Sequence, residues 1–141
     1  MTGVSWFEAA AYCPWAGIRL ANALEWDRAA RGIEGREYPW GNEMPDKTRA
    51  NYGMKVGHPT PVGLFRKGAT PEPEGVQDMA GNVWEWVADR YGETGKWRSL
   101  RGGSFDDSVR WFLWAEGRNL GIPEERNHKI GFRCVRGVGN D

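Results

Sequence analysis

The long stretch from residue 33 to residue 75 is the feature that most constrains the fold of this chain. It shows neither a helical period nor the alternation of a strand, and six prolines interrupt it: Pro39, Pro45, Pro59, Pro61, Pro71 and Pro73. Because proline disrupts helix interiors and central strands, we expect this stretch to be mostly irregular. Irregular segments of such length are uncommon inside a compact domain, and they usually carry function or need an anchor such as a metal ion.

Two short helices are expected before this stretch, because two segments have the pattern of a capping box. Residues 5–8 and 22–25 each place Ser or Asn three residues before Glu, so that each side chain can bind the backbone amide of the other residue. Pro14 with Gly17 is expected to end the first helix, and Gly32 is placed to end the second.

Short strands are expected after the irregular stretch, each bounded by turn residues. The candidate strands are residues 84–87, 99–101, 111–115 and 131–136. Helices early in the chain and strands late in the chain predict an α+β fold. With 141 residues, the chain is most simply one domain spanning residues 1–141.

The charge and the hydropathy of the chain exclude some partners. The 19 basic and 19 acidic residues balance, which argues against a dedicated nucleic-acid binder. No apolar run approaches the roughly 20 residues that span a bilayer, and no signal peptide is recognisable. We therefore expect no nucleic-acid partner and no membrane partner, and a cytoplasmic location is the default while the compartment stays unknown.

The segment DMAGNVWEWVAD, residues 78–89, combines two acids with a Gly-Asn pair and two tryptophans. Asp78 and Glu85 flank backbone carbonyls, and carboxylates with carbonyls are the oxygen ligands that Ca²⁺ prefers. The spacing differs from that of an EF-hand, and Gly81-Asn82 is also a common turn pair. Three alternatives are open from the residues alone: a metal loop, a surface that stacks on sugars, and a tightly turned piece of core.

The two cysteines, Cys13 and Cys134, lie near opposite ends of the chain. They have neither a CxxC spacing nor the spacing of a Cys/His zinc site. The residues alone allow two buried thiols or one long-range disulfide.

Several motifs occur in an order that resembles the formylglycine-generating enzyme and sulfatase-modifying-factor family. They are VSWFEAAAYCPWAGIRLANALEWDRAARG, EYPWGNEMPD, GVQDMAGNVWEWVAD, LRGGSF and GFRCVRG. The resemblance covers nearly the whole chain. It implies a modified C-type-lectin-like fold with two short helices, small antiparallel sheets and much irregular structure.

The resemblance also implies a structural calcium ion and a disulfide. The implied calcium ligands are the side chains of Asp78 and Glu85 and the carbonyls of Gly81 and Val83. A second calcium site of the family would begin at Asn51, but the acid expected a few residues later is not evident. The implied disulfide joins Cys13 to Cys134.

The catalytic groups of this family have no evident counterpart here. The enzymes use a thiolate pair that binds copper just after RGGS, and residues 105–114 contain no cysteine. Related iron enzymes use three histidines, whereas this chain has only His58 and His128. We therefore expect no formylglycine synthesis. The alternative is an oxidoreductase, or a degenerate enzyme remnant, of the sulfatase-modifying-factor class.

A binding surface is expected instead between residues 105 and 128. The family includes variable proteins of diversity-generating retroelements, in which the segment from RGGS to GFR binds ligands. The candidate residues are Phe105, Asp106, Asp107, Ser108, Arg110, Trp111, Phe112, Trp114, Glu116, Arg118, Asn119 and His128. The expected partner is a protein or another macromolecule. A purely structural module would instead bury Trp111, Phe112 and Trp114.

The resemblance begins at VSW, whereas family members usually carry a longer portion before this motif. That portion includes a strand that pairs with the C-terminal strand. We therefore expect either a preceding segment or a second subunit of a homo-oligomer to cover the strand edge near Val135.

Overall fold

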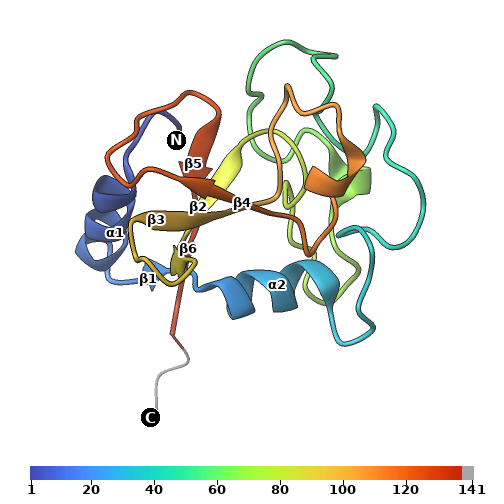
Figure 1. The fold of residues 1–141 in the computed structure, drawn as a ribbon. Helices are drawn as coiled ribbons and strands as arrows, with labels where there is room; N and C mark the ends of the chain where they lie inside the picture. Colours follow the sequence, from blue (N-terminus) through green and yellow to red (C-terminus); the bar gives the residue numbers. More distant parts are fainter. Residues whose placement is uncertain (138–141) are drawn as a thin grey trace.

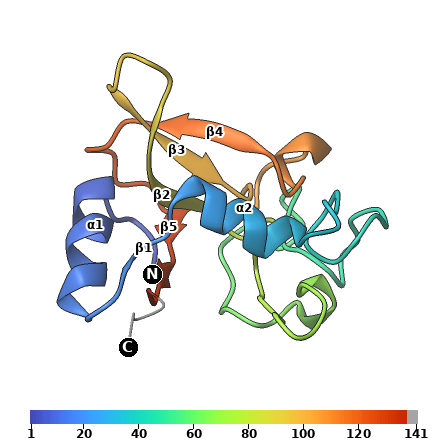
Figure 2. The same ribbon diagram turned by 90° about the horizontal axis from the view of Figure 1, so that it is seen from below.

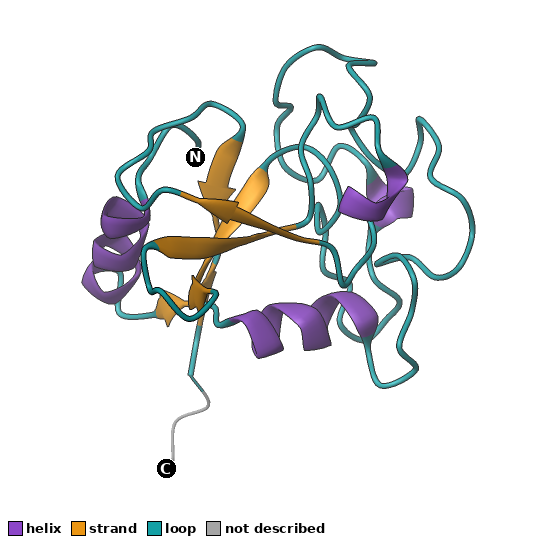
Figure 3. Cartoon of the chain, viewed as in Figure 1, coloured by secondary structure: helices purple, strands orange, loops and turns teal. Residues whose placement is uncertain are grey.

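The computed structural model describes residues 1–137 and has a mixed α and β architecture (Figure 1). Its elements are α1 (Trp6–Trp15), β1 (Arg19–Leu20), α2 (Ala23–Arg31), the 3₁₀ turn η1 (Arg66–Gly68), β2 (Trp84–Tyr91), β3 (Trp97–Arg101), the 3₁₀ turn η2 (Arg110–Phe112), β4 (Arg118–Gly121), β5 (Ile130–Phe132) and β6 (Cys134–Val135). Figure 1 and Figure 2 both place α1 at the end of the molecule that is remote from the irregular residues 33–75. Figure 3 shows that loops build most of this second half of the molecule.

Both helices begin at the predicted capping boxes. The Ser5 hydroxyl accepts from the Glu8 amide at 3.3 Å, and the Glu8 carboxylate accepts from the Ser5 amide at 2.7 Å. Asn22 and Glu25 make the same reciprocal pair at 2.8 and 3.0 Å. Gly32 ends α2 with a φ of 64°, as predicted. The first helix continues through Pro14 to Trp15, because the φ of proline is compatible with a helix and only one hydrogen bond is lost.

The main sheet has the strand order β4-β3-β2-β5, and a second sheet pairs β1 with β6. The pairings β1–β6, β2–β3 and β3–β4 are antiparallel as expected, whereas β5 runs parallel to β2. The predicted strand at 131–136 is also divided. Its first part, β5, belongs to the main sheet, and its second part, β6, pairs with β1, so that Arg133 lies between two sheets.

The predicted strand at residues 111–115 does not form. Successive turns replace it, with amide-to-carbonyl hydrogen bonds from Phe112 to Val109 at 3.1 Å and from Leu113 to Arg110 at 2.9 Å. Leu113 and Ala115 are buried, whereas Trp111 and Trp114 are exposed. The alternation that suggested a strand face therefore reflects a coiled segment that buries its small and aliphatic residues.

The core forms around the tryptophans of β2. Trp84 and Trp86 are both buried, and with Leu100 and Ile130 they pack against α1. The burial of both rings excludes the sugar-stacking alternative for this segment and fits a tightly turned piece of core. Glu85 lies between them in sequence and points to the opposite face of the strand.

A disulfide joins Cys13 on α1 to Cys134 on β6, with their Cα atoms 5.6 Å apart. It closes a loop over a sequence separation of 121 residues. In the chain-entropy model, a crosslink of this span stabilises the fold by about 5 kcal/mol. The bond therefore holds the first helix to the strand that pairs with β1.

The capping boxes make the stability of the helices dependent on pH. The pKa of Glu8 falls from 4.5 to about 2, mainly because the Arg126 side chain donates hydrogen bonds to its carboxylate. The pKa of Glu25 also falls from 4.5 to about 2, mainly because the Arg19 side chain donates hydrogen bonds to its carboxylate. Because these folded-state values lie below the unfolded values, the stabilisation is complete above pH 4.5 and is lost as the pH falls toward 2.

We therefore expect the melting temperature to fall between pH 4.5 and pH 2, and to fall less steeply in the E8Q/E25Q variant. Thermal denaturation followed by circular dichroism across this range tests the expectation. The control is E93Q, in the exposed turn between β2 and β3, which should keep the wild-type slope. An unchanged slope in E8Q/E25Q would contradict the assignment.

Candidate functional site

The turn before β2 has a backbone that few residues adopt. Asp78, Gly81 and Asn82 have φ values of 55°, 73° and 65°. A Cβ atom on Gly81 would lie 2.3 Å from the carbonyl oxygen of Asn51, so only glycine fits there. Hydrogen bonds from the Gly81 amide to Gly102 at 2.7 Å and from the Asn82 amide to Asn51 at 2.8 Å hold the turn in place.

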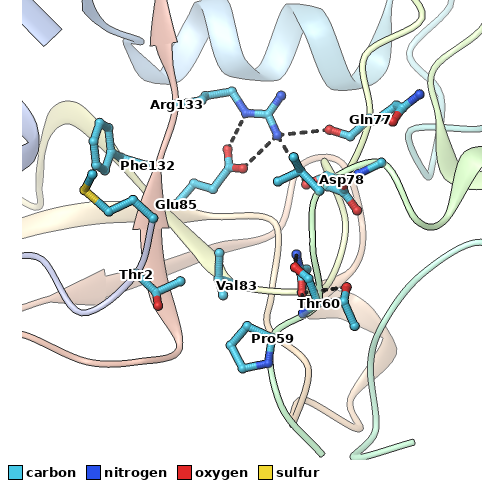
Figure 4. A pocket seen from close by; sticks show the side chains of 13 residues that line it. Thr2, Pro59, Thr60, Gln77, Asp78, Val83, Glu85, Phe132 and Arg133 are labelled. Carbon is cyan, nitrogen blue, oxygen red and sulfur yellow. Dashed lines mark hydrogen bonds and ion pairs between the residues drawn. The ribbon is translucent and has the colours of Figure 1, made fainter. Parts of the chain in front are cut away.

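The Glu85 carboxylate is the centre of a charged network behind this turn (Figure 4). The side chain of Glu85 is buried, and its Oε2 accepts from the indole Nε1 of Trp26 at 2.7 Å. Arg133 donates from Nε to Oε2 at 2.6 Å and from Nη2 to Oε1 at 2.7 Å. The same Nη2 donates to the carbonyls of Gln77 and Asp78, each at 3.2 Å.

Arg133 is therefore held as a cation beside Glu85. Burial lowers the pKa of the Arg133 guanidinium, but the charge of Glu85 and its hydrogen bonds outweigh this effect, so the net pKa is raised. The guanidinium neutralises Glu85 and ties β2 to the segment between β5 and β6.

A cavity of about 360 Å³ next to this network contains most of the implied calcium ligands. Asp78, Val83 and Glu85 line it together with Arg133, whereas Gly81 does not. We name it the Glu85 cavity. Within residues 1–137, no three His, Cys, Asp or Glu side chains cluster as a metal site. The implied calcium site would not form such a cluster, because it has only two carboxylates and relies on backbone carbonyls. The oxygens suit Ca²⁺ in kind, but Arg133 competes as a resident positive charge.

Removal of Arg133 should destabilise the fold strongly, because it leaves the Glu85 charge buried without a partner. We expect R133M to lose about 3 kcal/mol of unfolding free energy, the lower part of the range for buried pairs. The double variant E85Q/R133M should lose less than the sum of the two single variants. Urea denaturation of the four proteins measures the coupling.

The control for this cycle is R126M, which breaks the exposed ion pair with Glu8. It should lower the unfolding free energy much less than R133M does, because solvent screens an exposed ion pair. Additive effects of E85Q and R133M would show that the pair is not a stabilising unit.

Part of the predicted binding surface converges in a second cavity of about 440 Å³. Its lining residues are Glu37, Tyr38, Ser108, Val109, Arg110, Trp111 and Trp114. We name it the aromatic cavity. Four of the predicted ligand-binding residues lie in this lining, and they come from η2 and the turns around it.

Two tryptophans of this cavity are accessible to solvent, and one of them is hydrogen-bonded to a buried tyrosine. Trp111 is 57% exposed and Trp114 is 37% exposed. The indole Nε1 of Trp114 donates to the Tyr38 hydroxyl at 3.2 Å. Tyr38 is buried and stacks on Trp40, with ring centroids 5.2 Å apart. The alternative of a purely structural module expects Trp111, Phe112 and Trp114 all to be buried, and the exposure of Trp111 and Trp114 does not match that expectation.

Several predicted residues serve the scaffold instead. Phe105 is buried, and Phe112 turns toward the core to contact Trp84, with ring centroids 5.3 Å apart. The carboxylates of Asp106 and Asp107 each accept from the Ser104 hydroxyl at 2.7 Å. These four side chains shape the loop and present little of the cavity wall.

Asp106 also forms an ion pair with Lys129. Burial raises the pKa of the Asp106 carboxyl, but the hydrogen bonds from Lys129 and Ser104 outweigh it, and the net pKa is lowered. The carboxylate is therefore committed to an internal contact.

The remaining predicted residues lie outside the aromatic cavity. Glu116 lies in an adjoining cavity of about 400 Å³, where it pairs with Arg31 at 3.4 Å. Arg118 and Asn119 are on β4, paired with β3. His128 is exposed, and its ring centroid is 5.7 Å from that of Phe105.

Three cavity residues were not among the predicted ones: Val109, which lies within the predicted segment 105–128, and Glu37 and Tyr38, which lie far from it in sequence. Glu37 and Tyr38 belong to the irregular stretch, where no period marks a buried or exposed face. Their segment EYPWGNEMPD carried a resemblance and no chemical pattern of its own.

The described elements, with two helices, small sheets and a loop-built half, define a C-type-lectin-like fold. The model of the sulfatase-modifying factor enzyme 1-like domain matches residues 1–138. The chain therefore belongs to the sulfatase-modifying-factor, or formylglycine-generating-enzyme, family.

Two curated relatives illustrate the range of this family. The inactive C-alpha-formylglycine-generating enzyme 2 of Bos taurus is 37% identical over 151 residues, with 96% of this chain and 50% of that protein covered. The formylglycine-generating enzyme of Thermomonospora curvata is 34% identical, with 94% of this chain and 54% of that protein covered. The chain thus spans about half the length of these relatives.

Solved structures share the same fold. The Treponema denticola variable protein 1 superposes with a TM-score of 0.70 at 27% identity. The match covers 82% of this chain and 46% of the variable protein. The U1 variant of the Major Tropism Determinant has a TM-score of 0.62 at 18% identity, covers 92% of this chain and 36% of its own, and supports the fold alone. The relatives thus include both active and inactive enzymes as well as a variable protein.

Among residues 1–137, none of the helices combines the length and the apolar character needed to cross a membrane.

Proposed function

We propose that this chain is a non-catalytic binding domain that takes a protein ligand at the aromatic cavity. The carrying observation is the exposure of Trp111 and Trp114 above a buried, hydrogen-bonded Tyr38. Tryptophan, tyrosine and arginine are the residues that most often dominate binding energy at protein interfaces. The Trp114 ring is already hydrogen-bonded to Tyr38, so it loses less conformational freedom when a partner binds.

The cysteines support a non-catalytic role. The chain has two cysteines, and the disulfide between Cys13 and Cys134 uses both of them. Copper chemistry of the formylglycine-generating type needs thiolate ligands, and the carboxylates at Asp106 and Asp107 do not replace them. Conversion of a cysteine-containing sulfatase peptide by the purified, copper-treated protein would favour the enzyme alternative.

The variable proteins support a more specific form of the proposal, in which the segment 105–128 is diversified by a retroelement. The likeness to the Treponema denticola variable protein 1 motivates it. A repeat of the corresponding coding segment beside a reverse-transcriptase gene would support this origin. Its absence from the flanking DNA would contradict it.

The binding role predicts that the exposed rings contribute affinity more than stability. A partner selected on the wild-type protein should bind W111A and W114A at least about tenfold more weakly, in keeping with interface hot spots. The melting temperature of W111A should stay within a few degrees of the wild type, since surface truncations are mostly small in effect. W114A should lower it somewhat more, because it also removes the hydrogen bond to Tyr38. Calorimetric titration and thermal denaturation provide the two readouts.

The matched control is W15A, because Trp15 is 81% exposed on α1 and lies outside the cavity. It should keep the affinity of the wild type. Equal losses in W15A, W111A and W114A would place the binding site elsewhere or show a general effect of tryptophan removal.

Calcium at the Glu85 cavity is a second part of the proposal. The carboxylates of Asp78 and Glu85 with the carbonyls of Gly81 and Val83 would hold the ion, which would supply fixed positive charge to the turn. The cavity lined by Asp78, Val83 and Glu85 supports this assignment. The ion would share the Glu85 carboxylate with Arg133, so a modest affinity is expected.

Calcium should therefore raise the melting temperature, and a chelator should reverse the rise, because a ligand bound only by the folded state stabilises it. The D78N variant should lose the response. Asparagine tolerates the positive φ of position 78 and can still accept the 2.6 Å hydrogen bond from the Gly63 amide, so the turn should persist. A wild-type protein indifferent to calcium and chelator would contradict this part alone.

A further inference from the structure

The charges around the aromatic cavity are arranged unequally. The main chain of Glu37 is anchored, since its amide donates to Asn42 at 3.0 Å and its carbonyl accepts from Ala115 at 2.8 Å. Its carboxylate, in contrast, forms no hydrogen bond or ion pair with any residue from 1 to 137. The carboxylate is exposed and lines the same cavity as three aromatic rings, those of Tyr38, Trp111 and Trp114.

Three arginines lie near Glu37 and Trp114, and two of them are paired with other acids. Glu37 and Trp114 also line the adjoining cavity, together with Arg31 and Arg36. Each of these arginines pairs with another acid, Arg31 with Glu116 at 3.4 Å and Arg36 with Glu34 at 3.1 Å. Arg110 lines the aromatic cavity itself, and its Nη1 donates to the Met44 sulfur at 3.2 Å. The guanidinium therefore remains a positive charge at one border of the cavity.

Aromatic faces and a carboxylate together form the usual environment for an ammonium group. The ring faces are negative, and a cation within about 6 Å of a ring centroid is attracted to it. Glu37 adds a full negative charge at the position where a partner would exclude water. A neutral aliphatic side chain would gain from the rings alone and nothing from Glu37.

We propose that the aromatic cavity takes an alkylammonium side chain of a protein partner, either lysine or an N-methylated lysine. This inference rests on the proposed binding function and specifies the chemistry of its ligand. Trp111 and Trp114 contact the ammonium and its methylene stem, and Glu37 compensates its charge. Arg110 opposes the cation and favours an acidic group next to that lysine on the partner.

The test uses small probes in place of an unidentified partner. The probes are Nα-acetyl-lysine methylamide, the same compound with a trimethylated side-chain nitrogen, and a neutral analogue in which a methyl group replaces the side-chain ammonium. Titrations are followed by the indole NH signals of Trp111 and Trp114 in NMR spectra, assigned with the W111A and W114A variants. Both charged probes should bind at least about fivefold more tightly than the neutral analogue, the size of a cation–aromatic contact.

Two charge variants make the test specific. E37Q should weaken the charged probes several-fold and leave the neutral one unchanged. R110Q should strengthen the charged probes, since it removes a like charge. The control is E93Q, which changes an exposed carboxylate in the turn between β2 and β3 and should have no effect.

The outcomes separate this inference from the proposed function. Equal binding of charged and neutral probes, absence of binding by the charged probes, or insensitivity to both E37Q and R110Q would overturn the alkylammonium assignment. If a selected partner still depended on Trp111 and Trp114 in those cases, the binding function would stand. Loss of that dependence would overturn both.

Discussion

The ion pair between Glu85 and Arg133 is the interaction on which the arrangement of this protein depends. Glu85 lies on a central strand between two core tryptophans, and a buried carboxylate there requires a compensating charge. Arg133 supplies it and also binds the carbonyls of Gln77 and Asp78. One guanidinium thus joins the sheet, the turn before β2 and the segment that leads to the disulfide.

The two halves of the molecule differ in structure. The sheet, the two helices and the disulfide form a scaffold of regular structure. The loop-built half presents Trp111 and Trp114 on short turns that are fixed by hydrogen bonds to the main chain and to Tyr38. A rigid scaffold with accessible aromatic loops suits recognition, and it permits changes at the loop without loss of the core.

The sequence predicted the local elements well because their signals are local. The capping boxes at Ser5 and Asn22 need only residues three positions apart, and both helices start where predicted. The prediction of a strand at residues 111–115 was wrong because the conformation there also depends on contacts with distant parts of the chain. Its apolar residues fit a strand, but it is held as turns, and the Ala115 amide donates to the carbonyl of the distant Glu37 at 2.8 Å. The same limit explains Glu37 and Tyr38, whose relation to Trp114 exists only across 76 residues of chain.

The sequence by itself determined the helix starts, the family motifs and the absence of cysteine from residues 105–114. These depend on residue identity and short spacing alone. Only the tertiary structure decided that Arg133 faces Glu85, that Phe112 is turned inward while Trp111 and Trp114 remain accessible, and that Glu37 lines their cavity. The physical reason is that charge compensation and exposure depend on which distant segments the fold brings together, and no local pattern encodes this.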